Sequence, residues 1–182
     1  AQDYLLAANP VVHLDAAQSL YERADNLTDR LAALRWISHY EEVEKREAVL
    51  ADFYSRWRHE ALVVNQWLTV QATRPDVDCV ESVQALMTHP AFDWRNPNKL
   101  RALIGAFAGA NPIAFHREDG AGYRLMGEVI ERLQASNPQI AARMLAPITR
   151  WRRYAVGQEA MRAELERLAA IDPLPKDVFE VV

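Results

Sequence analysis

Residues 96–107 read NPNKLRALIGAF, and residues 137–148 read NPQIAARMLAPI. In both segments Asn is a favourable helix N-cap, because its side chain accepts a hydrogen bond from a free amide of the first turn. Proline suits the next position, since it has no amide hydrogen to leave unpaired and its φ is already helical. In the first segment, apolar residues recur at i, i+3, i+4 and i+7 from Leu100, which is the spacing of one helix face. Each segment is therefore predicted to begin an amphipathic helix.

The two helix starts, Pro97 and Pro138, lie 41 residues apart, within the range of about 40–47 residues typical of paired-helix repeats. Asn-Pro also occurs at 9–10 and 111–112, where it predicts further helix starts. Similar apolar stripes cover the rest of the chain: 27, 31, 34 and 37; 43, 50, 53, 54 and 57; 63, 67 and 70; 80, 83 and 87; 126, 129, 130 and 133; 140, 144, 148 and 151; 161, 165 and 168. We predict an all-α fold, a superhelical stack of antiparallel helix pairs of the HEAT or armadillo kind, as one module over residues 1–182.

The composition of the chain excludes several classes of protein. Its 182 residues are 50% hydrophobic and 25% charged, as in a globular domain, and glycine is scarce, with only 6 residues. No apolar run is long enough for a transmembrane helix, so no membrane partner is expected. The net charge of −4 argues against a nucleic-acid partner. The single Cys79 cannot form an internal disulfide, which fits a cytoplasmic location.

No motif for metal binding or catalysis stands out. The pair His59-Glu60 is followed by Val63 where a zinc-protease helix needs a second His, so we expect no metal site and an exposed helix end there. Cys79 has apolar neighbours and is expected to be a buried small residue. We therefore predict that this chain has no catalytic residues and holds no cofactor.

Two charged segments also have structural explanations. The loop 115–123, with His116, Glu118 and Asp119, is expected to be a turn whose polar groups bond their own backbone. The basic cluster 150–154 is expected to be a solvated helix end, where arginines favour the helix dipole.

Two arginines have a more suggestive setting. Arg101 shares a helix face with Gly105 and Ala108, and Arg143 shares one with Gln139 and Arg150. Pro147 cannot donate a hydrogen bond to the carbonyl of residue 143, so the second helix should kink there. Arg101, Arg143 and Gln139 are therefore candidates for lining a cavity. The alternative is a bend of the superhelix with arginines on its surface.

The chain resembles the C-terminal domain of the bacterial aminopeptidase N family, a group of gluzincin zinc metallopeptidases. The resemblance runs in order through residues 20–182. It rests on the motifs at 24–34, 53–57, 62–72, 96–107, 111–112, 115–116, 119–123, 137–143 and 150–154.

The resemblance implies a four-domain enzyme that removes N-terminal residues from peptides. Zinc and the catalytic groups would lie in an earlier domain, which would be the partner of this chain. This chain would be the distal, all-helical part of the enzyme, would roof the active-site cavity and would restrict entry to peptides and slender chain ends. The positions of Arg101 and Arg143 would face that cavity, where a guanidinium can hold the carboxylate of a peptide. The alternative is a free-standing helical-repeat scaffold that binds a partner on its concave face.

Overall fold

The computed structural model describes the backbone of residues 10–182 and the side chains from His13 onward. Helices follow one another throughout this part, and no β-strand occurs in it, which confirms the predicted all-α fold. The helices are α2 (Pro10–Arg23), α3 (Leu27–Tyr40), α4 (Val43–Trp57), α5 (Ala61–Ala72), α6 (Cys79–Leu86), α7 (Pro97–Leu100), the π-helical turn η1 (Arg101–Gly105), α8 (Ala106–Ala110), α9 (Pro112–Phe115), α10 (Ala121–Gln134), α11 (Pro138–Met144), α12 (Ala146–Thr149), the 3-10 turn η2 (Trp151–Arg153), α13 (Gln158–Ala169) and α14 (Lys176–Phe179).

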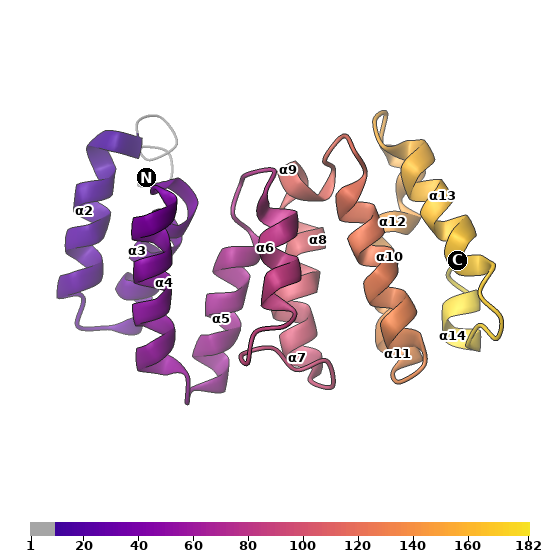
Figure 1. Ribbon diagram of the computed structural model, residues 1–182, viewed down its shortest axis with the longest axis horizontal. Coiled ribbons are helices and arrows are strands. Elements are labelled where there is room, and N and C mark those ends of the chain that lie inside the picture. Colours follow the sequence, from indigo (N-terminus) through magenta and orange to yellow (C-terminus); the bar gives the residue numbers. More distant parts are fainter. Residues whose placement is uncertain (1–9) are drawn as a thin grey trace.

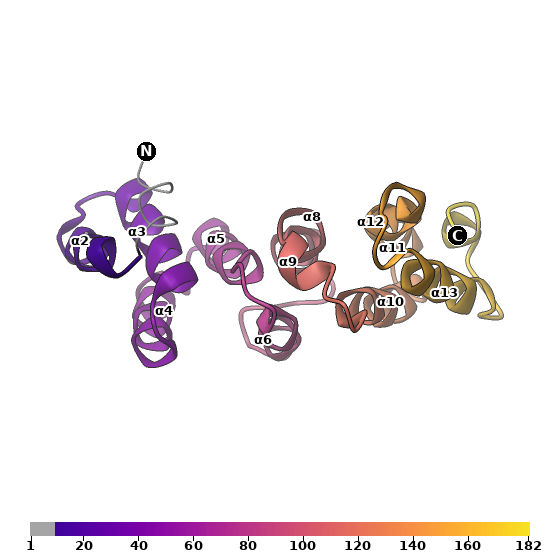
Figure 2. The ribbon, with the colours of Figure 1, turned by 90° about the horizontal axis from the view of Figure 1, so that it is seen from above.

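The helices form an elongated array, from α2 at the indigo end to α14 at the yellow end (Figure 1). Seen from above, they lie in two layers (Figure 2). Layer one contains α4, α6, α10 and α13, and layer two contains α3, α5, α7 to α9, α11, α12 and α14. At the end of the array α2 packs against α3. Within layer two α5 packs against η1, and within layer one α10 packs against α6 and α13. This is the predicted superhelical stack.

Asparagine caps start the helices where the sequence predicts them. The Oδ1 atom of Asn96 accepts from the amide of Asn98 at 2.9 Å, and that of Asn137 accepts from the amide of Ile140 at 3.2 Å. Asn111 caps α9, and its Nδ2 also donates to the carbonyl of Ala72, the last residue of α5, at 3.0 Å and to that of Arg74, two residues later, at 2.7 Å. The cap therefore joins two helices as well as starting one. Asn9, the fourth predicted cap, lies outside the described residues.

The predicted apolar stripes point between the layers, with one exception. The stripe of α10 is nearly inaccessible to solvent, as are the stripes that begin at Leu100 and Met161. Val43 is 63% exposed, and the buried part of α4 begins only at Val49. Assigning Val43 to the inward face was therefore wrong: it is the first residue of the helix, and no neighbour covers it.

Two helices are interrupted, one as predicted and one not. The stripe from Ile140 to Trp151 predicts one long helix with a kink at Pro147, but the chain forms α11, α12 and η2 in succession. Pro147 has no amide hydrogen for the carbonyl of residue 143, and the helix is interrupted at Leu145, which confirms the kink. The single long helix was wrong, because a 3-10 turn forms its end. The π-helical turn at η1 was not predicted.

Candidate functional site

A pocket of about 410 Å³ opens in layer two between η1–α8 and α11–α12. These two segments do not pack closely against each other, and α10 of layer one lies beneath them. The pocket is lined by Arg101, Gly105, Ala108, Gly109, Met126, Arg143, Met144, Ala146, Pro147, Arg150 and Tyr154.

The first wall of the pocket is the π-helical turn. The amide of Ala106 donates to the carbonyl of Arg101, five residues back, and this bond defines the wider turn. The hydroxyl of Thr69 on α5 donates to the carbonyl of Ala102 at 3.0 Å. The turn is thus held from the side away from the pocket. Such turns occur frequently at functional sites.

The base of the pocket is apolar. Met126 on α10 and Met144 on α11 are both buried, at 1% and 8% exposure. The small residues Gly105 and Ala108 leave room above them. Thioether side chains fill irregular apolar space and contact aromatic rings favourably. The base therefore suits an apolar group of a ligand.

The rim of the pocket carries positive charge that nothing nearby neutralises. Arg101, Arg143 and Arg150 are exposed, and none of the three pairs with a carboxylate among the described side chains. Arg101 donates instead to the amide oxygen of Asn98. No lining residue is acidic. Because these guanidinium groups bind no carboxylate among the described side chains, the rim suits a planar anion such as a carboxylate.

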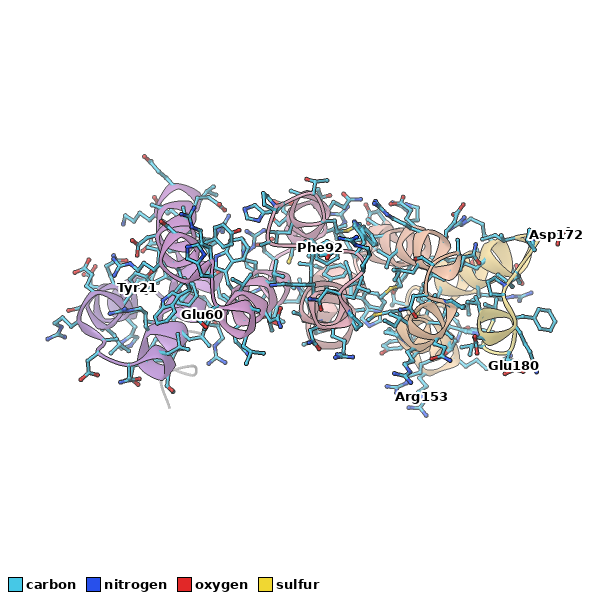
Figure 3. All side chains as sticks on the ribbon, turned by 90° about the horizontal axis from the view of Figure 1, so that it is seen from below. Tyr21, Glu60, Phe92, Arg153, Asp172 and Glu180 are labelled. Carbon is cyan, nitrogen blue, oxygen red and sulfur yellow. The ribbon has the colours of Figure 1, made fainter. Side chains whose placement is uncertain are left out.

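Charge also distinguishes the middle of layer two from layer one. The layer-two segments 61–73, 97–113 and 138–154 contain no Asp or Glu. In the third of these segments, 138–154, the side chain of Arg153 projects outward from the array (Figure 3). Two arginines of layer one, by contrast, form ion pairs: Arg162 with Glu166 at 2.7 Å, and Arg167 with Glu131 at 2.8 Å. These layer-one ion pairs are typical of a solvent-facing surface, and the three layer-two segments named above contain no carboxylate that could form them.

Tyr154 closes one side of the pocket, and its ring is supported from behind. It lies 4.3 Å, centroid to centroid, from the ring of His116. The Nδ1 atom of His116 lies 2.8 Å from the hydroxyl of Tyr123, which is 1% exposed. Burial lowers the pKa of His116 and raises that of Tyr123. Both groups are therefore neutral near pH 7.

The structure brings together two of the three residues that the sequence singled out. Arg101 and Arg143 both line the pocket, with Gly105 and Ala108 on the face of Arg101 as expected. Gln139 is exposed on the first turn of α11 and is not among the lining residues.

Sequence reasoning missed Tyr154 and the base of the pocket. It placed Arg150 on the helix face of Arg143 but assigned it to a solvated helix end and not to the site. One signal was available, because no acidic residue occurs between positions 94 and 117 or between 132 and 158. Two such stretches in a chain of net charge −4 indicate a basic face.

The remaining candidate residues have structural roles. His59 is exposed next to Glu60, the N-cap of α5. In the predicted turn, Asp119 accepts from Arg117 at 2.9 Å and from the amide of Ala121 at 3.0 Å, and these bonds lower the pKa of Asp119 to about 2.

Cys79 is fully buried, which raises its pKa to about 11. Within residues 10–182, no three His, Cys, Asp or Glu side chains gather where they could hold a metal ion. In the same part of the chain, no helix has the length and apolar character needed to cross a membrane.

Known proteins resemble most of this chain. A family model described as "Domain of unknown function (DUF3458_C) ARM repeats" matches residues 1–182. Aminopeptidase N of Haemophilus influenzae is 45% identical over 166 residues, which make up 91% of this chain and 19% of that protein. Aminopeptidase N of Escherichia coli is 41% identical over 163 residues, or 89% of this chain and 19% of that protein.

A solved structure shows the same fold. The crystal structure of Legionella pneumophila aminopeptidase A in complex with aspartic acid superposes with a TM-score of 0.89 at 32% identity, and the match covers 98% of this chain and 21% of that one. The chain thus spans about a fifth of the length of these relatives. It belongs to the DUF3458_C family of ARM-repeat domains and corresponds to one segment of bacterial aminopeptidases.

Proposed function

We propose that this chain is the non-catalytic C-terminal domain of a zinc aminopeptidase that removes N-terminal amino acids from peptides in the cytoplasm. Its similarity to aminopeptidase N over 91% of its length supports this assignment. Zinc and the catalytic groups would come from the remainder of the polypeptide, which would be the main partner of this domain. In this proposal, layer two roofs the active-site cavity and limits which chains can enter.

The observation that carries the proposal is the set of arginines that bind no carboxylate in the described part of the chain, in layer-two segments that contain no Asp or Glu. A peptide held by its N-terminus at a catalytic centre presents its C-terminal carboxylate at the far end of the cavity. Arg101 and Arg143 would hold that carboxylate by charge-assisted hydrogen bonds. Gln139 lies one helical turn before Arg143 and would line the cavity beside the pocket.

The proposal is tested by the variant Arg143→Ala in the parent enzyme. We expect kcat/KM for a tetrapeptide to fall about tenfold, because a hydrogen bond to a charged group contributes about 1.5–3 kcal/mol and exposure weakens it. Hydrolysis of an alanine anilide, which has no distal carboxylate, should stay unchanged. Arg162→Ala on layer one is the matched control. Equal losses on both substrates would contradict a role for Arg143 in holding the far end of the peptide.

The reading frame that contains this segment separates the proposal from its alternative. An upstream HExxH motif in the same frame supports a peptidase domain, because that motif supplies zinc ligands and a general base. A short frame that contains this segment alone would favour a free-standing scaffold. We also expect this chain without the remainder to show no zinc-dependent hydrolysis of amino-acid anilides.

A further inference from the structure

We propose that Tyr154 is a specificity-determining residue of the pocket: its ring packs on the apolar side chain of the C-terminal residue of a peptide. In this proposal His116 is the positioning residue that holds the ring at the pocket. The inference rests on the proposed function, and it names the substrate class as peptides that end in an aromatic or large aliphatic residue.

The apolar part of the pocket carries the first step of the argument. A ligand that offered only a carboxylate would bind the arginine rim and leave Met126, Met144 and the Tyr154 ring uncovered. Aromatic rings and thioethers contribute most when they contact an apolar or aromatic group. The volume of about 410 Å³ lies within the range of about 300–1,000 Å³ typical of small-molecule sites. The lining therefore fits an anion with an adjoining apolar side chain.

The second step is that residues outside the pocket position the Tyr154 ring. The residue follows η2 and is 36% exposed, so its own surroundings hold it weakly. The centroid of its ring lies 4.3 Å from that of His116, with 38° between the two planes. His116 in turn is bonded to the Tyr123 hydroxyl, and the Tyr123 ring meets Phe115 edge-on at 5.4 Å. Tyr123 is thus a buried anchor for a stack that ends at the pocket.

The backbone that follows Tyr154 also packs against Tyr123. Gly157 has a φ of +76°, a conformation that favours glycine. A Cβ atom built on Gly157 would lie 2.3 Å from the Tyr123 hydroxyl oxygen. The segment from 154 to 157 is therefore fixed to Tyr123 at both ends, once through His116 and once through the close approach of Gly157.

The test measures binding of blocked peptides to this chain, so it does not depend on catalysis. The probes are N-acetyl-Ala-Ala-Phe, N-acetyl-Ala-Ala-Gly and the C-terminal amide of the first, titrated while the amide resonances are followed by NMR. We expect the Phe peptide to bind about tenfold more tightly than the Gly peptide, and the amide to lose binding. Tyr154→Ala should remove the preference for Phe, and Tyr40→Ala on the distant α3 should keep it.

Two variants of His116 separate positioning from folding. His116→Phe keeps an aromatic ring under Tyr154, and His116→Gln keeps a polar group for Tyr123 without a ring. We expect His116→Phe to retain the preference for Phe and His116→Gln to lose it, although both variants still bind the Gly peptide.

Each outcome has a distinct meaning. Equal affinity for the Phe and Gly peptides, or no binding of either, would overturn the inference. Loss of the preference in both His116 variants would overturn the positioning role of the ring. Absence of aminopeptidase activity in the full polypeptide would overturn the proposed function, yet the selectivity measured on this chain would stand.

Discussion

Gly122 allows α9 and α10 to approach so closely that a methyl group at this position should destabilise the fold. A Cβ atom on Gly122 would lie 2.3 Å from the carbonyl oxygen of Phe115 and 2.8 Å from its carbonyl carbon and Cα. These are backbone atoms, so no side chain can rotate away, and the helices must separate by about 1 Å to restore ordinary contact. The hydrogen bond between His116 and Tyr123 joins the two residues that directly follow Phe115 and Gly122, so it spans the same close approach.

The magnitude for Gly122→Ala follows from two opposing effects. Overpacking a well-ordered core costs about 1–3 kcal/mol, and we take the upper value because the backbone must move. Replacing Gly by Ala in a helix returns at most about 1 kcal/mol. The net loss is about 2 kcal/mol, which for a chain of this size lowers Tm by about 4–8 °C.

The assay is thermal unfolding followed by circular dichroism at neutral pH, with Gly109→Ala as the matched control. Gly109 lies in α8, and nothing lies within 4 Å of the position that its Cβ atom would take. The same chemical change should therefore stabilise the fold there, by about 0.5–1 kcal/mol. If Gly122→Ala melted at or above the temperature of the unmodified chain, the close approach inferred for α9 and α10 would be wrong.

Three further predictions concern buried groups. Burial lowers the folded-state pKa of His89 and His116, so below about pH 6.5 the unfolded chain binds more protons than the folded chain. The free energy of unfolding, measured by urea titration, should therefore fall from pH 7.5 to pH 5.5. A free energy that did not change with pH would show that neither imidazole resists protonation. Asn111→Ala removes a helix cap and two bonds to buried carbonyls, and should cost about 3 kcal/mol by urea unfolding, whereas a loss below about 1 kcal/mol would mean that water replaces the amide. The thiol of Cys79, with its pKa raised to about 11, should react with Ellman's reagent at pH 8 only after the chain unfolds, and rapid reaction of the native chain would contradict its burial.

The helices themselves could be predicted from short stretches of sequence. The caps at Asn96, Asn111 and Asn137 and the stripe of α10 depend on residues within a few positions of one another, and they form as expected. The interruption near Pro147 also follows from local chemistry, since proline lacks the amide hydrogen that the helix requires. The exposure of Val43 was missed because periodicity shows which face a residue shares and not whether a neighbouring helix covers it.

The pocket depends on contacts between segments far apart in the chain. Helix spacing placed Arg101 and Arg143 each on a face of its own helix, but whether those faces meet depends on how layer two is spaced over α10. The π-helical turn and the stack of Tyr154 on His116 likewise depend on partners some 30 to 40 residues away. Local backbone preferences therefore account for the array of amphipathic helices, because caps and periodicity act over one or two turns. The arginine rim and its apolar base arise from packing between layers, because a gap between two helices has no signature within either of them.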